Sequence, residues 1–188
     1  EGSLRRLGTD YLDVYYIHWP NSNVPIAETM GALDELQREG KIRVAACSNF
    51  GKQDLSGLLE TGRVEANQLA YNLLFRAIEY EIQGICSEHH IGITCYSPLA
   101  QGLLTGKFRT MDEVPTGRAR TRHFASSRPG TRHGELGAEA EVIEALGRIK
   151  EICDEVQMGH ASLAWLISRD AVASVIVGAR TPEQAIGN

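Results

Sequence analysis

The first long apolar run of the chain, residues 11–19, is rich in β-branched and aromatic residues and is stopped by Pro20. A run that is apolar on both faces is typical of a strand in a parallel sheet covered by helices. Period-two alternation places Val14, Tyr16 and His18 on one face of this strand. A polar ring at the carboxyl end of such a strand is how a barrel delivers a side chain to an active-site rim, so His18 is a candidate for chemistry. The alternative is a packed histidine that caps the strand.

Segments with the periodicity of a strand alternate along the chain with segments that have the periodicity of a helix. The first predicted helix carries its apolar stripe on Ile26, Met30, Leu33 and Leu36 and ends at Gly40. Further helices are predicted from the apolar stripes within residues 55–59, 78–86, 142–156 and 163–167, and a last helix starts after Thr181. In the stripe of residues 142–156, Ile152 and Val156 are expected to face the core together with Val142. The other predicted strands are residues 42–47, 68–71, 91–96 and 173–177.

This alternation of strands and helices indicates an α/β fold with a parallel sheet and right-handed crossovers. Polar or special residues follow the strands at their carboxyl ends: His18, Ser48 with Asn49, Tyr96 with Ser97, and residues 178–181. The distribution favours a barrel whose loops build one rim over a doubly wound sheet, where special residues concentrate at one switch point. No G-x-G-x-x-G motif follows any of the strands.

Residues 100–137 break the pattern, because they are rich in Gly, Arg, Thr and Ser and lack periodicity. The segment is too long for an ordinary connection between two elements. We therefore expect a functional loop, a lid or a disordered insert.

Composition narrows the classes of partner. With 43% hydrophobic residues the chain can bury a real core, and its formal charge of −5, without runs of like charge, favours neither nucleic acid nor an anionic membrane as a partner. No apolar stretch approaches the roughly 20 residues that span a bilayer, so a cytoplasmic location is expected. The four cysteines are predicted to be small buried hydrophobes, and the histidines show no metal-binding spacing, so no metal site is expected.

The polar groups after the strands match the needs of a dinucleotide. A nicotinamide needs an aromatic face, such as Tyr96, and hydrogen-bonding partners for its carboxamide, such as Ser48, Asn49 and Gln68. A pyrophosphate needs backbone N–H groups and a helix N-terminus. Each residue also has a structural interpretation: Ser48 and Asn49 as turn residues, Gln68 as a polar group inside a barrel, and Tyr96 as core.

Several stretches resemble motifs of the aldo-keto reductase family and occur in the family's order. They are residues 12–20, residues 40–50, Gln68 with Tyr71 and Asn72, residues 96–107, and residues 175–184. The last stretch and the loop with Lys107 look most like the bacterial and potassium-channel-β-subunit-like branches. The resemblance implies a (β/α)8 TIM barrel that binds NADP(H) without a Rossmann domain and reduces aldehydes or ketones to alcohols.

The resemblance also implies roles for residues at matched positions. His18 would orient the substrate carbonyl, and Tyr96 would stack on the nicotinamide. The residues that hold the carboxamide would be Ser48, Asn49 and Gln68. Those along the pyrophosphate would be Ser97, Pro98, Leu99, Ala100 and Lys107. Those around the adenosine 2′-phosphate end of the cofactor would be Gly178, Arg180, Gln184 and Asn188. A guanidinium such as that of Arg180 suits phosphate recognition.

The resemblance covers what look like strands 4 to 8 of the barrel. The family's catalytic tyrosine, with its lysine and aspartate, belongs to the earlier portion, and Tyr16 lies two residues deeper than His18 without a lysine partner. We therefore expect residues 1–188 to be a partial barrel domain that lacks the amino-terminal strands, which a missing segment or self-association would complete. Gly187 stands where the family tends to have glutamate before the asparagine, which weakens the adenine-side assignment of Asn188 only slightly.

The leading hypothesis is thus an NADP-dependent aldo-keto reductase acting on a small carbonyl substrate, with little activity as this chain alone. A catalytically silent NADP-binding regulatory subunit of the same fold is the alternative. An unrelated (β/α)8 hydrolase or isomerase would leave the Ser48–Asn49 pair, Gln68 and residues 96–99 unexplained. The substrate itself would be set by residues 101–137 and by the missing loops.

Overall fold

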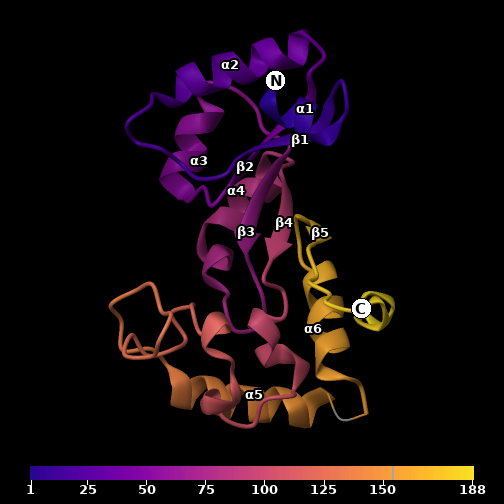
Figure 1. Ribbon diagram of the computed structural model, residues 1–188. Helices are drawn as coiled ribbons and strands as arrows, with labels where there is room; N and C mark the ends of the chain where they lie inside the picture. Colours follow the sequence, from indigo (N-terminus) through magenta and orange to yellow (C-terminus); the bar gives the residue numbers. More distant parts are fainter. Residues whose placement is uncertain (154) are drawn as a thin grey trace. The chain divides into compact units, whose positions relative to one another are not determined.

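The computed structural model describes residues 1–153 and 155–188 (Figure 1). Two compact units make up the chain. Unit 1 consists of Glu1–Ala70, Ala77–Tyr96 and Arg169–Ser174. Unit 2 consists of Tyr71–Arg76, Ser97–Ser168 and Val175–Asn188.

A parallel sheet forms the centre of unit 1, with its strands in the spatial order β1-β2-β3-β4-β5. The strands are β1 Leu12–Ile17, β2 Ile42–Ser48, β3 Ala66–Ala70, β4 Gly92–Tyr96 and β5 Val172–Val175, the last residue of which belongs to unit 2. The pairs β1–β2, β2–β3 and β3–β4 are all parallel. Spatial order follows chain order, without the reversal that defines a doubly wound sheet. The predicted parallel α/β sheet of five strands is confirmed.

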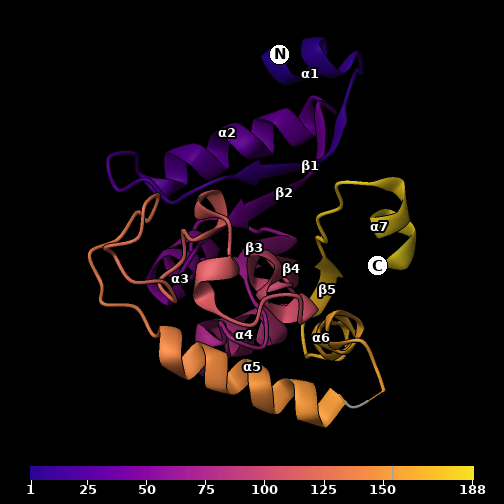
Figure 2. The same ribbon diagram turned by 60° about the horizontal axis from the view of Figure 1, so that its bottom comes forward.

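Helices follow β1, β2 and β3 of unit 1, as the alternation predicted. They are α2 Ile26–Arg38, α3 Lys52–Leu59, the 3-10 helix η1 Ala77–Tyr80 and α4 Ile82–Glu88. A further short helix, α1 Gly2–Leu7, precedes β1 and was not predicted. The helix α2 lies beside β2 (Figure 2). Its buried residues are Met30 and Leu33. It ends where the sequence predicts, since Gly40 adopts a left-handed φ of 71° that a glycine tolerates without strain.

The sheet of unit 1 is curved, and the two faces of its strands differ. One face of β2, β3 and β4 is fully buried, with Cys47, Asn67 and Ile93 at 0% exposure. On the other face, the Tyr16 hydroxyl of β1 lies 3.4 Å from the Thr94 hydroxyl of β4. Strands in a flat sheet are spaced about 4.8 Å apart, so β1 and β4 would stand about 14 Å apart. The contact therefore requires a concave face, as in a barrel wall.

The cysteines of unit 1 behave as the sequence predicts. Cys47, Cys86 and Cys95 are buried and free. Burial raises the pKa of the Cys47 thiol to about 12 and that of Cys86 to about 11, so both are protonated at neutral pH. They pack as small apolar residues. The fourth cysteine, Cys153 of unit 2, is only partly buried, so the prediction does not hold fully for it.

Unit 2 has its own core, to which the aperiodic segment 100–137 contributes. The segment contains η2 Ala100–Thr105, η3 Met111–Glu113 and η4 Thr116–Arg118, and α5 Glu139–Cys153, α6 Met158–Ile167 and α7 Pro182–Gly187 follow it. Leu103, Leu104 and Phe124 are at most 1% exposed and pack with Val142 and Leu146 of α5. The apolar side chains that hold this segment in place are isolated along the sequence. The segment therefore contributes to a core although its sequence shows no periodicity.

The prediction that Ile152 and Val156 face the core is wrong, because these side chains are 83% and 56% exposed. At about 100° per residue, Ile152 lies roughly 80° away from the stripe that Val142 starts on α5. Val156 lies beyond the end of the helix.

An ionic clamp ties the aperiodic segment to the start of α5. The Arg128 guanidinium donates two hydrogen bonds to the Glu139 carboxylate, one of them 2.6 Å long, and pairs with Asp112 at 2.8 Å. The backbone N–H of Ala125 also donates to Glu139, at 2.9 Å. These hydrogen bonds, that from Arg128 above all, lower the pKa of Glu139 below its ordinary value.

No helix among residues 1–153 and 155–188 combines the length and the apolarity that a membrane crossing requires.

Replacing Gly137 with Ala should destabilise unit 2 by about 2 kcal/mol or more. Gly137 has a φ of 79°, and a Cβ atom there would lie 2.5 Å from the carbonyl carbon of Phe124. Urea unfolding measures the effect. The matched control is Gly134→Ala, where a Cβ atom meets nothing within 4 Å; equal midpoints for the two variants would contradict the steric argument.

Replacing Glu139 with Gln should lower the free energy of unfolding by about 1 kcal/mol at neutral pH. Because the folded-state pKa of Glu139 is lowered, the carboxylate stabilises the fold fully above its ordinary pKa of 4.5 and loses this effect as pH falls through the folded-state pKa. The difference between the two proteins should therefore shrink on acidification, as measured by denaturant unfolding across pH. Glu144→Gln removes an exposed pair with Arg148 and serves as the control. If the two proteins still differed in unfolding free energy below the folded-state pKa, the charge of Glu139 would not be what stabilises the fold.

Candidate functional site

The register of the sheet brings several predicted site residues of unit 1 onto its concave face. Ser48 is paired with Gln68, and Gln68 with Thr94. Tyr96 lies two residues after Thr94 and so shares its face. The sequence predicted that Ser48 and Tyr96 lie at strand carboxyl ends and that Gln68 lies within a strand, and the structure places all three on this face.

Asn49 joins three strand ends through its side-chain amide. Its Nδ2 group donates to the backbone carbonyl of His18 at 3.1 Å and to the Ser48 hydroxyl at 3.0 Å. Its Oδ1 atom accepts a 2.9 Å hydrogen bond from the Tyr96 hydroxyl. Asn49 adopts a φ of 64°, a left-handed conformation that asparagine tolerates better than most residues. Both amide hydrogens are thus engaged, and Oδ1 keeps one free lone pair.

Ser48 is also part of the scaffold. Its hydroxyl donates to the backbone carbonyl of Gln68 at 3.1 Å, and the residue is only 3% exposed. A neighbouring buried amide, that of Asn67, donates to the carbonyl of Phe50 at 2.9 Å. Hydrogen bonds from Ser48 and Asn67 therefore connect the end of β2 and the segment after it to the next strand.

Gln68 differs from these residues, because its side-chain amide makes no hydrogen bond to any described residue. It is half-buried on the concave face. Its donors and its acceptor are therefore available to a ligand, whereas those of Ser48 and Asn49 are mostly committed to the fold.

Tyr96 is held as a neutral ring at the end of β4. Burial raises the pKa of its phenol above the ordinary value of 10, so the hydroxyl remains a hydrogen-bond donor at neutral pH. The His18 side chain is exposed, and its ring centroid lies 6.2 Å from that of Trp19.

In unit 2, residues 97–102 adopt an unusual backbone. Ser97, Ala100 and Gln101 have positive φ angles of 53°, 46° and 57°, and Gly102 follows at 100°. Asn72 donates a 2.9 Å hydrogen bond to the carbonyl of Ser97. Non-glycine residues in this region are strained and cluster at functional sites, and turns that alternate in handedness can point successive N–H groups at an anion. Pro98 and Leu99 lie within this segment.

Three cationic side chains of unit 2 form a cluster: Lys107, Arg118 and Arg180. Lys107 and Arg118 approach Gly102, where a Cβ atom would lie 3.3 Å from the Lys107 ammonium and 3.5 Å from the Arg118 guanidinium. Partial burial, followed by the charges of Arg118 and Arg180, lowers the pKa of Lys107. None of the three pairs with a described Asp or Glu, so the cluster carries uncompensated positive charge and suits an anion. Sequence reasoning missed Arg118, because its only signal was the clustering of arginines between Arg109 and Arg132.

The carboxyl-terminal segment of unit 2 is organised around the start of α7. Thr181 caps this helix by accepting a 3.3 Å hydrogen bond from the N–H of Gln184. The N–H of Arg180 donates to the Gln184 side chain at 2.8 Å. Gly178 and Asn188 are exposed.

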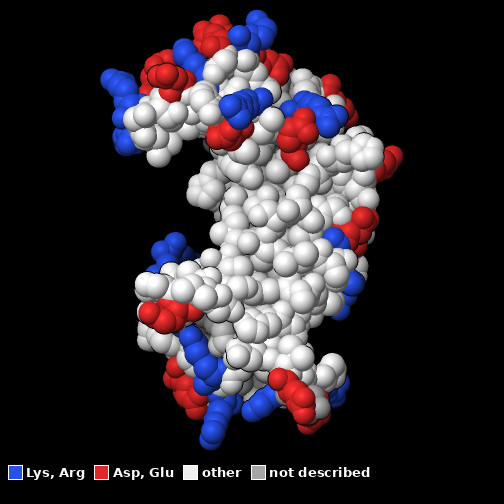
Figure 3. All heavy atoms as spheres, turned by 90° about the vertical axis from the view of Figure 1, so that its right-hand side faces the viewer, with Lys and Arg blue, Asp and Glu red and all other residues white. Residues whose placement is uncertain are grey.

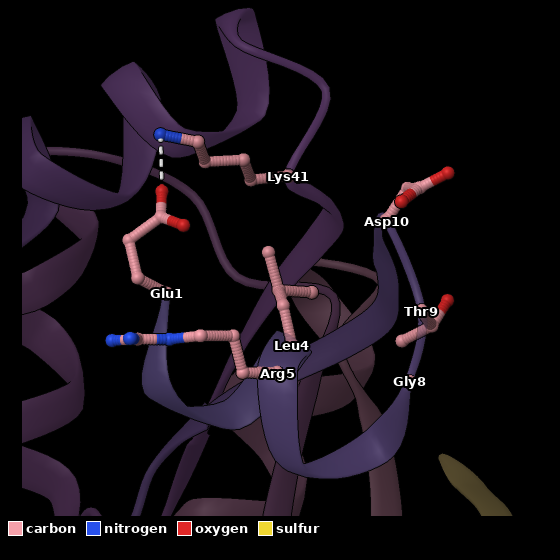
Figure 4. A pocket seen from close by; sticks show the side chains of 7 residues that line it. All are labelled: Glu1, Leu4, Arg5, Gly8, Thr9, Asp10 and Lys41. Atoms are coloured by element: carbon pink, nitrogen blue, oxygen red, sulfur yellow. Dashed lines mark ion pairs between the residues drawn. The ribbon is translucent and has the colours of Figure 1, made fainter.

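A pocket in unit 1 is lined by none of the strand-end residues described above for that unit. Figure 4 shows the residues that line it, which are Glu1, Leu4, Arg5, Gly8, Thr9, Asp10 and Lys41. Asp10 precedes β1 and Lys41 precedes β2, so the pocket lies at the amino ends of the strands. Lys41 and Glu1 in the lining of this pocket form an ion pair with each other, marked in Figure 4 by the dashed line.

On the face drawn in Figure 3, Lys and Arg side chains are interspersed with Asp and Glu side chains. The described residues contain no group of three or more His, Cys, Asp or Glu side chains that could hold a metal ion.

A family model, that of the aldo/keto reductase family, matches residues 1–188. The chain belongs to the aldo/keto reductase family. This confirms the resemblance found in the sequence motifs.

Curated relatives of this chain are identical to it at about a third of the aligned positions. An NADH-specific methylglyoxal reductase of Escherichia coli is 37% identical over 191 residues, which cover 99% of this chain and 56% of the relative. An NADP(+)-designated aldo-keto reductase of Schizosaccharomyces pombe is 31% identical over 89% of this chain and 48% of its own length. The chain thus spans about half the length of the curated relatives it matches.

Solved aldo-keto reductase structures share the fold. A glycerol dehydrogenase from Gluconobacter oxydans matches with a TM-score of 0.83 at 27% identity, over 98% of this chain and 54% of the other. An aldo/keto reductase from Klebsiella pneumoniae in complex with NADP and acetate matches with a TM-score of 0.66 at 27% identity, over 98% of this chain and 60% of the other.

Replacing Tyr96 with Phe should lower the free energy of unfolding by about 1 kcal/mol, because it removes the donor to Asn49 and leaves that oxygen unpaired. The measurement is denaturant unfolding followed by circular dichroism. Tyr80→Phe is the matched control, since Tyr80 is 88% exposed. Equal stability of the two variants would show that the Asn49 hydrogen bond does not contribute to holding the strand ends.

Proposed function

We propose that this chain belongs to an NADP(H)-dependent reductase that converts small aldehydes or ketones to alcohols. The observation that carries the proposal is the shared face of Ser48, Gln68 and Tyr96, where an unengaged amide lies on the same concave surface as an aromatic ring. We also propose that β1 to β5 are strands 4 to 8 of a (β/α)8 barrel, of which residues 1–188 form one part.

The polar groups of unit 1 fit the nicotinamide end of the cofactor. The Gln68 amide can both donate to and accept from the carboxamide, and Asn49 Oδ1 has a lone pair left for its N–H. Ser48 contributes by holding Asn49 and the Gln68 carbonyl in place. The Tyr96 ring, fixed through its hydroxyl, would stack on the nicotinamide.

The groups of unit 2 fit the phosphate-bearing end. The strained backbone of Ser97, Pro98, Leu99 and Ala100 would run along the pyrophosphate together with Lys107. The cationic cluster supports this assignment, and Arg118 joins the residues proposed from the sequence. The adenosine 2′-phosphate end of the cofactor would be surrounded by Gly178, Arg180, Gln184 and Asn188, with Asn188 on the adenine side. The positive charge of Arg180 favours NADP(H), which carries the 2′-phosphate, over NAD(H), which does not. The NADH-specific Escherichia coli relative makes this preference a point to test.

NADP(H) supplies a hydride to the carbonyl carbon when it is bound. The exposed imidazole of His18 would orient the substrate carbonyl by donating a hydrogen bond to its oxygen. The resulting alkoxide needs a proton donor, and we assign none among the described residues, since the Tyr16 hydroxyl faces Thr94. The proposal therefore gives these residues the tasks of binding and orientation.

The test is NADPH binding and NADPH oxidation in the natural protein that contains this chain. Tyr96→Ala should weaken NADPH binding by about 1 to 3 kcal/mol, the scale of stacking on an aromatic side chain. Fluorescence titration measures the affinity, with Tyr80→Ala as a control that should leave it unchanged. Unchanged affinity in the Tyr96 variant would overturn the stacking role. Tight binding without turnover on any aldehyde or ketone would favour a silent regulatory subunit.

A further inference from the structure

Asn72 is a buried polar residue of unit 2 whose side chain is hydrogen-bonded to backbone groups. It belongs to one of the stretches that resemble family motifs, and it is 3% exposed. Its Oδ1 atom accepts hydrogen bonds from the N–H groups of Leu74 and Phe75, both 2.9 Å long. Its Nδ2 group donates to the carbonyl of Ser97, also at 2.9 Å. The amide, satisfied in this way, connects the turn after β3 to the segment after β4.

The turn that begins at Asn72 is firmly held. The N–H of Asn72 donates to the carbonyl of Phe75 at 3.2 Å, and the N–H of Phe75 donates to the carbonyl of Asn72 at 3.1 Å. Leu73 and Leu74 pack against the core of unit 2. The imidazole of His123 donates to the carbonyl of Leu74 at 3.3 Å, because a carbonyl only accepts. The turn therefore presents the amide of Asn72 from a fixed position.

The carbonyl of Ser97, at the other end of this link, belongs to strained backbone. Ser97 has a φ of 53°, in the left-handed region that a residue with a Cβ atom rarely adopts. Its carbonyl accepts a second hydrogen bond, from the N–H of Ala100 at 2.9 Å. Because Pro98 has no N–H, this carbonyl is the only polar group of the peptide unit between Ser97 and Pro98. The hydrogen bonds from Asn72 and Ala100 therefore decide where the negative end of this peptide dipole points.

The direction of this carbonyl matters for the binding of an anion. A carbonyl oxygen that turned toward a phosphate would repel it, whereas unengaged backbone N–H groups attract it. The N–H of Leu99 donates to no described residue, so it is available to such a ligand. By engaging the Ser97 oxygen, Asn72 keeps that oxygen from turning toward an anion bound at this segment.

We propose that Asn72 is a positioning residue for the pyrophosphate of NADP(H), because its amide fixes the Ser97 carbonyl and thereby the backbone of residues 97–102. The inference rests on the proposed function, in which residues 97–100 run along the pyrophosphate. Without the amide, Ser97 relaxes toward a negative φ, and its carbonyl and the N–H groups after it turn. NADPH and NADH both carry the pyrophosphate, so both lose affinity. Adenosine 2′-monophosphate has no pyrophosphate, so its binding does not depend on this backbone.

The experiment measures dissociation constants for three ligands in the full natural protein that contains this chain and in its variants. NADPH and NADH are titrated by fluorescence, and adenosine 2′-monophosphate by its displacement of NADPH. Asn72→Ser isolates the link, because its hydroxyl can accept from the N–H groups of the turn but is too short to reach Ser97. It should raise the Kd for NADPH and for NADH about five- to tenfold, the range expected for one lost hydrogen bond. The Kd for adenosine 2′-monophosphate should change less than about twofold.

Two further variants complete the set. Asn72→Ala also loses the acceptor of the turn, so it should raise the Kd for NADPH and NADH at least as much as Asn72→Ser. Ser162→Ala is the matched control, since Ser162 is 1% exposed and its hydroxyl donates to the carbonyl of Met158 at 2.7 Å. It removes another buried hydrogen bond of unit 2 and should change none of the three constants.

The outcomes separate this inference from the function on which it rests. Failure of the unmodified protein to bind NADPH would overturn the proposed function. Constants for NADPH and NADH that are unchanged in the Asn72 variants would overturn the role of Asn72 and leave the proposed function standing. An equal rise in all three constants would also overturn it, because a merely structural role weakens every ligand together. If Asn72→Ala does not fold, Asn72→Ser carries the same prediction and the same contradicting outcomes.

Discussion

The amide of Asn49 is the interaction on which the strand-end site of unit 1 depends. Through two donated hydrogen bonds and one accepted, it connects His18, Ser48 and Tyr96, which follow or end three different strands. Parallel strands without such links are joined only by their ladders, which end where the strands end. The left-handed backbone at Asn49 is the strain that this arrangement carries.

This arrangement divides the polar groups into those that build the site and those that remain free for a ligand. Ser48 and Asn49 donate their side-chain hydrogen bonds to backbone and side-chain partners within the chain. The Gln68 amide makes no such hydrogen bond to a described residue. Preorganisation of this kind means that binding does not have to order the surrounding groups. In unit 2 the positive charges of Lys107, Arg118 and Arg180 have no acidic partner among the described residues, so they favour the binding of an anion.

Much of the fold could be predicted, because periodicity reports directly on burial. The five strands, the end of α2 at Gly40 and the buried cysteines all follow from local patterns. The prediction failed for Ile152, where an apolar residue lies on the edge of a helical stripe, and it missed Arg118, whose neighbours in space are not its neighbours in sequence. The aperiodic segment hid its core because its buried residues are isolated and separated by turns.

The sequence by itself determined the order of strands and helices, the family, and the residues at the strand ends, since each depends on local spacing and motif identity. Only the tertiary structure decided which of those side chains form hydrogen bonds within the chain and which do not. Ser48, Asn49 and Gln68 look equivalent as a polar series, yet the register and the curvature of the sheet engage the first two and leave the third free. Hydrogen-bond partners distant in sequence, such as Asn49 with Tyr96 or Asn72 with Ser97, are set by packing, which local pattern does not encode.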